Sequence, residues 1–311
     1  MRSEMRFMIL LLVAGYGSVS SLGARPGEAG AAVRAEMRNV TYHFTEGVSV
    51  RIVMLRGALE PTTTGGWPVL DRADSFNIRV DSSRILVLPS DLAGVLNTYV
   101  FSAKDAPLKG ISIGVEKGRL KLKGKLHSKG DIPFEVLASL SANGDGRVRL
   151  HTEKVQALHL PVKGLMELFG IEINDLIKNG KVRGLEAEKD DLLLTLDRVL
   201  PPPRLEGPVT DIHIAGEYIV TVIGKADKAG GATGNFMAFK GNQLQFGKLL
   251  MNDADLTITD LDPSDPLDFF LERYKDQLVP GYSKITPSFG LRVFMKDFDK
   301  LPAKKPVTSR R

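Results

Sequence analysis

Apolar and polar residues alternate along a central stretch of the chain, residues 109–160. Two turn signals interrupt the alternation: Lys117-Gly118, and the Asn-Gly-Asp-Gly run of residues 143–146, whose residue types tolerate the positive φ of tight hairpins. Successive side chains of a strand point to opposite faces, so this pattern predicts an antiparallel β-meander with one apolar and one basic face. The apolar face includes Ile113, Leu122, Phe134 and Val136.

Two segments with helical spacing flank the meander, residues 90–101 and 161–178. Ser90 is expected to cap the first helix, because its hydroxyl can accept a free N–H of the first turn. Apolar side chains recur three and four residues apart along one face of each segment. Core packing is the ordinary role of such a face, and lining an apolar groove requires the same pattern. Its members are Leu92, Val95, Leu96 and Tyr99 in the first segment and Leu165, Leu168 and Phe169 in the second.

Strand patterns fill most of the remaining chain. A long strand is predicted over residues 36–59, and shorter strands over 76–80, 85–88 and within 182–224. Residues 235–300 have the pattern of a β-β-β-α-β unit, whose helix is predicted to begin at Asp265-Pro266 and to end at Leu278. A sheet this large has more apolar face than a few helices can cover. It must therefore close, pack against another sheet, or curl round its helices and leave an apolar groove.

The first 31 residues have the features of an export signal. Arg2 and Arg6 precede an apolar run over residues 7–14, and small residues follow, with Ala29-Gly30-Ala31 as one cleavage option. The apolar run is too short to span a bilayer comfortably. We therefore expect residues 1–31 to be a cleaved signal peptide and leader, and the protein to be exported. An uncleaved N-terminal membrane anchor is the alternative.

Composition gives the domain boundaries and excludes some chemistry. A segment rich in glycine and alanine, residues 225–234, is expected to link a domain over residues 32–224 to an extension over residues 235–300, and a basic tail at 301–311 is expected to be disordered. The chain has no cysteine, which excludes a disulfide framework and a thiolate metal site. Its formal net charge is +5, and because export separates the protein from nucleic acid, we expect no nucleic-acid partner.

The chain lacks the short motifs of common catalytic sites. It has no G-x-S-x-G, H-E-x-x-H or G-x-G-x-x-G sequence, and its five histidines are scattered without metal-ligand spacing. Asp253, Asp255, Asp260, Asp262 and Asp265 form an acidic segment, but a calcium loop needs ligands at fixed offsets around a glycine, and a strand-like alternation runs through the middle instead. We therefore expect a strand edge followed by a helix cap, with no catalytic residue, no cofactor and no metal site.

A basic stripe follows one predicted strand of the meander. Arg119, Lys121, Lys123 and Lys125 alternate with apolar residues, so strand geometry places them on one face, and Arg149 joins them if its strand lies near. One interpretation is a solvated face that resists aggregation. The other is attraction to an anionic membrane surface, which would weaken as salt is added.

The order of segments over residues 76–224 resembles the LmeA-like phospholipid-binding family of exported bacterial proteins. The matching segments are SDLAGVLNTYVF (90–101), GRLKLKGKL (118–126), residues 132–162, LMELFGIEINDLI (165–177) and residues 190–224 with their proline cluster. The resemblance implies an α+β fold related to the tubular lipid-binding (BPI-like) proteins: a long, strongly curved antiparallel sheet wrapped around amphipathic helices. It also implies an apolar groove for acyl chains and no catalytic residues. Residues 235–300 fall outside the resemblance and are expected to extend the same sheet.

We therefore expect a periplasmic or cell-envelope protein, not an enzyme, that holds phospholipid or another acyl lipid for carrying or sensing, with the head group at the groove mouth near a Lys or Arg. The first alternative is a non-catalytic envelope accessory protein that binds another protein through its sheet and basic face. An enzyme is the third hypothesis and would need the histidines or the 253–265 aspartates to converge. The oligomeric state stays open. The groove is expected to be lined by Leu92, Val95, Leu96, Tyr99, Leu165, Leu168, Phe169, Ile113, Leu122, Phe134 and Val136, and the anionic surface to meet Arg119, Lys121, Lys123, Lys125 and Arg149.

Overall fold

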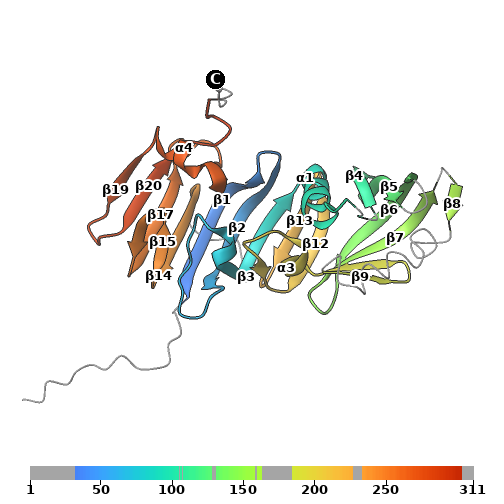
Figure 1. Cartoon of the computed structure of the whole chain (residues 1–311), viewed down its shortest axis with the longest axis horizontal. Coiled ribbons are helices and arrows are strands. Elements are labelled where there is room, and N and C mark those ends of the chain that lie inside the picture. Colours follow the sequence, from blue (N-terminus) through green and yellow to red (C-terminus); the bar gives the residue numbers. More distant parts are fainter. Residues whose placement is uncertain are drawn as a thin grey trace, which may run out of the picture.

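The computed structural model describes residues 32–104, 106, 108–127, 131–157, 160–162, 184–226 and 233–302. The expected signal peptide, residues 163–178 of the second expected helix with Leu165, Leu168 and Phe169, residues 227–232 of the expected linker and the tail from residue 303 lie outside the described residues. The first two residues of that expected helix, 161 and 162, belong to a strand instead. Within them the protein is mostly β-sheet with few helices, and its sheet is strongly curled into a half-barrel. The elements form an elongated row, with C-terminal strands at one end and the predicted meander at the other (Figure 1).

The larger sheet has 11 strands in the described part of the chain. They are β1 (Val33–Thr45), β2 (Val48–Pro61), β3 (Phe76–Val87), β11 (Leu205–Glu206), β12 (Val209–Ala215), β13 (Tyr218–Ile223), β14 (Phe236–Gly241), β17 (Ala254–Asp260), β18 (Leu267–Phe270), β19 (Tyr282–Ile285) and β20 (Leu291–Met295). Their main order is β12-β13-β3-β2-β1-β14-β17-β20-β19, while β11 pairs with β3 and β18 with β1. The β1–β18, β3–β11 and β17–β20 pairs are parallel, so the expectation of a wholly antiparallel sheet is wrong.

A second sheet contains the predicted meander. Its described strands are β4 (Leu108–Glu116), β5 (Arg119–His127), β6 (Asp131–Ala142), β7 (Val148–Ala157), β8 (Leu160–Val162), β9 (Leu185–Glu188) and β10 (Asp191–Leu194). Strands β4 to β7 pair in sequence and antiparallel, which confirms the meander. The meander forms a sheet of its own, however, instead of continuing one long sheet. A separate two-stranded ribbon joins β15 (Leu244–Phe246) to β16 (Leu249–Met251).

The described helices are short. They are η1 (Ala73–Ser75), α1 (Pro89–Val95), η2 (Leu96–Val100), α3 (Leu196–Val199), η3 (Leu271–Arg273) and α4 (Tyr274–Leu278). The predicted helix at 90–101 is confirmed as α1 and η2, but Ser90 does not cap it. Pro89 stands in the first turn, where its missing N–H and fixed φ suit a helix start, and Leu88 occupies the cap position without a side-chain hydrogen bond.

Two other predictions need correction. The long strand predicted over 36–59 is the β1–β2 hairpin, which turns at Glu46-Gly47. The helix predicted from Asp265-Pro266 begins only after Phe270, because residues 267–270 form strand β18, and all four of its residues are buried. A short run of mostly apolar residues fits either a buried strand or a helical turn, and its spacing alone does not separate the two.

Strand β1 joins the N-terminal and C-terminal parts of the larger sheet. Over its whole length it pairs with β2, while its other edge pairs first with β14 and then with β18. Asn39 lies where the partner changes, and its φ of 55° is a left-handed conformation that asparagine tolerates better than most residues. Its side-chain amide donates to Asn235 Oδ1, just before β14. Strands β14 and β18 therefore pair directly with β1, and β17, β20 and β19 extend the same sheet beyond β14.

Candidate functional sites: an apolar cavity and an acidic cluster

An apolar cavity of about 220 Å³ lies between the two sheets and is partly open to solvent. The edge strand β12 of the larger sheet contacts β6 of the smaller one, and α1 contacts both β2 and β4. Side chains from all these elements, and from β3, β5, β7, β10 and β13, line the space. The cavity therefore exists only because the two sheets and α1 come together.

Hydrogen bonds to one side chain hold η2 against the smaller sheet. Asn97 Nδ2 donates to the Ile111 carbonyl at 2.7 Å, and Asn97 Oδ1 accepts from the Ile111 N–H at 3.0 Å. These two bonds pair the backbone N–H and carbonyl of Ile111 on β4, as a neighbouring strand would. Close packing holds the preceding helix, α1, against the larger sheet, because a Cβ built on Gly94 of α1 would lie 2.6 Å from Val48 Cγ2 on β2. Neither residue stood out in the sequence pattern, since both roles depend on long-range pairing.

The structure places seven of the expected groove residues at this cavity: Leu92, Val95, Leu96, Ile113, Leu122, Phe134 and Val136. Tyr99 is not among the lining residues, and 40% of its surface is exposed. Leu165, Leu168 and Phe169 lie outside the described residues. The larger sheet supplies lining that the sequence did not assign, including Val50, Ile52, Leu55, Ile78, Ile85, Ile212 and Ile219.

Few polar groups line the cavity. They include the hydroxyl groups of Ser49 and Thr221 and the carboxyl group of Asp91, while no Lys or Arg of the described chain is among the lining residues. Burial raises the pKa of Asp91 above its ordinary value, although hydrogen bonds from Ser49 oppose the rise. The described lining thus offers no cationic partner for a phosphate, and its one carboxylate would repel an anionic group.

The basic stripe lies on the outer face of the smaller sheet and is paired with acidic residues. Lys121 Nζ lies 2.8 Å from Glu116 Oε2 and 2.9 Å from Glu135 Oε1, and its hydrogen bonds lower the pKa of both carboxyl groups. The others pair in the same way: Lys123 with Glu135, Arg119 with Glu153, and Arg149 with Asp191. Only Lys125 has no ion pair within the described part of the stripe. Most of the positive charge on this face is therefore locally balanced.

Described histidines also pair separately with aspartates. His43 bonds Asp268 at 2.6 Å, His151 bonds Asp191 at 2.6 Å, and two further pairs join His127 to Asp131 and His213 to Asp211. His159 lies outside the described residues. The pairs lie on different strands, so the described histidines do not converge on one pocket.

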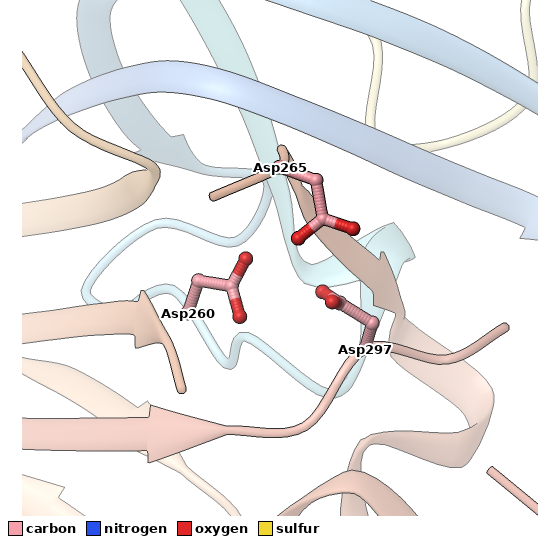
Figure 2. A group of neighbouring side chains, drawn as sticks. All are labelled: Asp260, Asp265 and Asp297. Atoms are coloured by element: carbon pink, nitrogen blue, oxygen red, sulfur yellow. The ribbon is translucent and has the colours of Figure 1, made fainter. Parts of the chain in front are cut away.

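Three carboxyl groups converge at the C-terminal end of the larger sheet. Asp260 ends β17, Asp265 lies in the following loop, and Asp297 follows β20 (Figure 2). One oxygen from each lies within 4.8 Å of the other two. Asp260 and Asp265 belong to the acidic segment of the sequence, whereas Asp297 was missed. It is brought in by the parallel pairing of β17 with β20, in which Asp260 stands opposite Met295.

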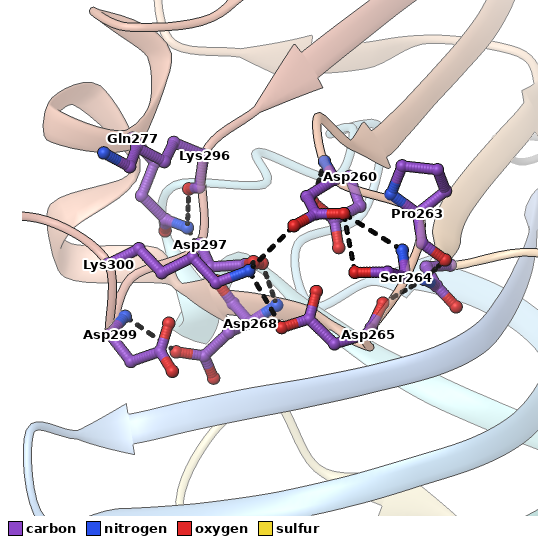
Figure 3. A network of polar contacts seen from close by, with 12 residues as sticks. Asp260, Pro263, Ser264, Asp265, Asp268, Gln277, Lys296, Asp297, Asp299 and Lys300 are labelled. Atoms are coloured by element: carbon purple, nitrogen blue, oxygen red, sulfur yellow. Dashed lines mark hydrogen bonds and ion pairs between the residues drawn. The ribbon is translucent and has the colours of Figure 1, made fainter.

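Each buried carboxyl group of this cluster is held by a backbone N–H. Asp260 Oδ1 accepts from the Asp262 N–H at 2.7 Å, and Asp297 Oδ1 accepts from the Asp268 N–H at 2.8 Å (Figure 3). Lys300 Nζ lies 2.8 Å from Asp265 Oδ2 and 3.1 Å from Asp297 Oδ2, which raises the pKa of the lysine. Burial raises the pKa of Asp260 to about 6, and the neighbouring Asp297 and Asp265 carboxylates add to the rise.

Comparisons with known proteins give no relative. No helix of the described chain is both long enough and apolar enough to cross a membrane. The chain matches no family model, and neither the curated proteins nor the solved structures contain a significant match to it.

Proposed function

We propose that this protein binds the acyl chains of a lipid in the cavity between its two sheets. The observation that carries the proposal is the partly open, apolar cavity itself, lined from both sheets and from α1. At roughly 24 cal/mol per Å³, an unfilled cavity of about 220 Å³ would cost on the order of 5 kcal/mol of stability. An acyl chain would offset that cost and contribute roughly 0.8 kcal/mol for each CH₂ it buries.

The lining also determines which end of a lipid would enter. Apolar side chains dominate it, and the carboxyl group of Asp91 disfavours an anionic head group inside. The acyl chains would therefore enter and the head group would stay at the cavity mouth. The predicted export signal and the segment order that resembles the LmeA-like family support phospholipid as the class of lipid and the cell envelope as the location.

Native mass spectrometry of the purified protein, followed by organic extraction, tests the proposal. We expect discrete adducts that extract as phospholipid, and we expect delipidated protein to regain them from phospholipid liposomes. A clean apo mass that stays clean after incubation with liposomes would contradict the proposal.

Two substitutions on one strand provide a matched test. Ile113 and Val115 lie two residues apart on β4 and so point to the same face, but only Ile113 lines the cavity. Val115 is 38% exposed. Ile113→Trp should fill part of the cavity and weaken lipid binding by roughly 0.8 kcal/mol for each acyl CH₂ that it displaces, whereas Val115→Trp should bind lipid like the wild type. Equal lipid occupancy in the two variants would mean that lipid binds elsewhere.

The accessory-protein hypothesis is favoured by one feature of the surface. Strand β19 is the free edge of the larger sheet, and its four residues are all exposed. Ile285, the last residue of β19, is 76% exposed, and Phe289 in the turn that follows is 92% exposed. A partner strand could add to such an edge through main-chain hydrogen bonds. Ile285→Lys should then abolish co-purification of an envelope partner without changing lipid occupancy; unchanged co-purification would reject this second candidate.

A further inference from the structure

Asp260, Asp265 and Asp297 each direct one oxygen toward a common point (Figure 2). Three carboxylate oxygens of the cluster are buried: Asp260 Oδ2, Asp265 Oδ1 and Asp297 Oδ2. Within the described chain the first two have no hydrogen-bond partner, and Asp297 Oδ2 has only the ion pair with Lys300 Nζ at 3.1 Å. Asp260 and Asp297 are themselves only 5% and 2% exposed. Buried carboxylate oxygens are costly unless they are paired or bind a metal. We propose that the three carboxylates form a binding site for a divalent cation, and that Ca²⁺ is the ion that fits it.

The lysine beside the cluster does not balance its charge. Lys300 Nζ forms ion pairs with Asp262, Asp265 and Asp297. One positive charge therefore faces three carboxylates, and Asp260 is a fourth acidic group nearby. The side chain of Lys300 is 36% exposed, and it can swing into water when a stronger cation arrives.

The ligand oxygens are already oriented. The backbone N–H groups of Asp262 and Asp268 hold Oδ1 of Asp260 and of Asp297, and each bond turns the other oxygen of its carboxyl group toward the site (Figure 3). Such outer hydrogen bonds fix metal ligands and strengthen their binding. The site therefore needs little rearrangement apart from the displacement of Lys300.

The donor set and its spacing favour Ca²⁺. Oxygen ligands suit hard cations, and two oxygens on one Ca²⁺ at ~2.3–2.6 Å lie up to about 5 Å apart, whereas Mg²⁺ at ~2.0–2.1 Å allows only about 4 Å. The three oxygens lie within 4.8 Å of one another, a bound that the ligand spacing of Ca²⁺ accommodates in full. The Asp265 side chain is 43% exposed, so water can complete the coordination from its side. The bound ion would link the end of β17, the following loop and the segment after β20.

Isothermal titration of Ca²⁺ into the metal-stripped full chain tests the proposal, with Mg²⁺ titrated in parallel. We expect one site for Ca²⁺ that binds Mg²⁺ more weakly. Asp260→Asn keeps the Oδ1 acceptor for the Asp262 N–H but loses the charge, and it should weaken Ca²⁺ binding at least tenfold. Asp255→Asn, on the same strand but paired with Lys240, is the matched control and should bind like the wild type. Asp265→Asn, at a more exposed position, gives the same test if Asp260→Asn does not fold.

The variant Lys300→Met distinguishes a cation-binding site from a cluster that is stabilised only by its ion pairs with the lysine. If the lysine occupies the place of a metal, its removal should raise the affinity for Ca²⁺, and Ca²⁺ should restore the thermal stability that the variant loses. If the lysine is the only cation of the cluster, the variant should lose stability and Ca²⁺ should restore none of it. No Ca²⁺ binding to the wild type, or equal binding by wild type and Asp260→Asn, would overturn the proposal, and equal affinity for Mg²⁺ would overturn the assignment to Ca²⁺.

Discussion

Replacing Val136 with isoleucine adds one methylene to a side chain that lines the apolar cavity. Val136 lies on β6, is 3% exposed and belongs to the lining. Its neighbour on β7, Val155, stands directly opposite it in the strand register and is 4% exposed, but does not line the cavity. The same substitution at Val155 is therefore a control with the same chemistry, the same kind of element and almost the same burial.

The two substitutions should change stability in opposite directions. At Val136 the new methylene enters empty space, so it should raise the free energy of unfolding by about 0.8 kcal/mol. At Val155 it enters a close-packed region, where overpacking typically costs about 1–3 kcal/mol. Isoleucine and valine are both β-branched, so strand propensity stays nearly constant. The expected difference between the variants is therefore on the order of 2–4 kcal/mol.

Urea denaturation of delipidated protein, followed by far-ultraviolet circular dichroism, measures this difference. The slope of the transition should be equal in wild type and variants, because a change in the slope would report on compactness instead of packing. Adding liposomes should then stabilise the wild type more than Val136→Ile, since the variant has less space for an acyl chain. If Val136→Ile destabilises the protein as much as Val155→Ile, the space at Val136 is filled in solution and the cavity cannot be a binding site.

Three further predictions use other parts of the chain. Burial raises the pKa of Asp91, so its charged form destabilises the folded state at pH values above the ordinary carboxyl pKa. Asp91→Asn should therefore raise the melting temperature at neutral pH, and this gain should shrink as the pH falls toward the ordinary carboxyl pKa. Burial disfavours the charged form of Asp191, but hydrogen bonds from Arg149 and His151 outweigh this effect and lower the pKa of its carboxyl group. The stability that this carboxylate contributes should be present at neutral pH and lost as the pH falls through its lowered pKa. In Asp191→Asn, the melting temperature should fall less over the same pH range. Phe289 has a φ of 63° and is 92% exposed, so Phe289→Gly should relieve backbone strain and stabilise the protein by about 1 kcal/mol in urea denaturation.

The sequence predicted those elements whose pattern is local. Strands β4 to β7 follow from strict alternation and from turns rich in glycine and asparagine, so the inward positions of Ile113, Leu122, Phe134 and Val136 could be read directly. The apolar face of the helix gave Leu92, Val95 and Leu96 for the same reason. The turn at Glu46-Gly47 was missed because its residues are inconspicuous and the alternation runs on through them.

Features that depend on strand order could not be predicted. Many of the described residues that line the cavity come from the larger sheet, and nothing in the pattern of Ile52 or Ile212 tells which strand lies across from it. Asp297 is distant in sequence from Asp260, and only the parallel register of β17 and β20 brings the two together. Local periodicity states which face is apolar, but it does not state what covers that face.

What covers each face also explains why the cavity lies where it does. At the C-terminal end of the larger sheet, Leu256, Ile258, Leu267 and Met295 are at most 1% exposed, and the cavity beside Ile258 is only about 30 Å³. At the other end the larger sheet faces the smaller one, and the short helix pair α1–η2 is the only described helical cover between β2 and β4. Two concave apolar faces and one short helix cannot close-pack over their whole length. The unfilled space is therefore a consequence of the two-sheet arrangement, and it is the space in which we propose that an acyl chain binds.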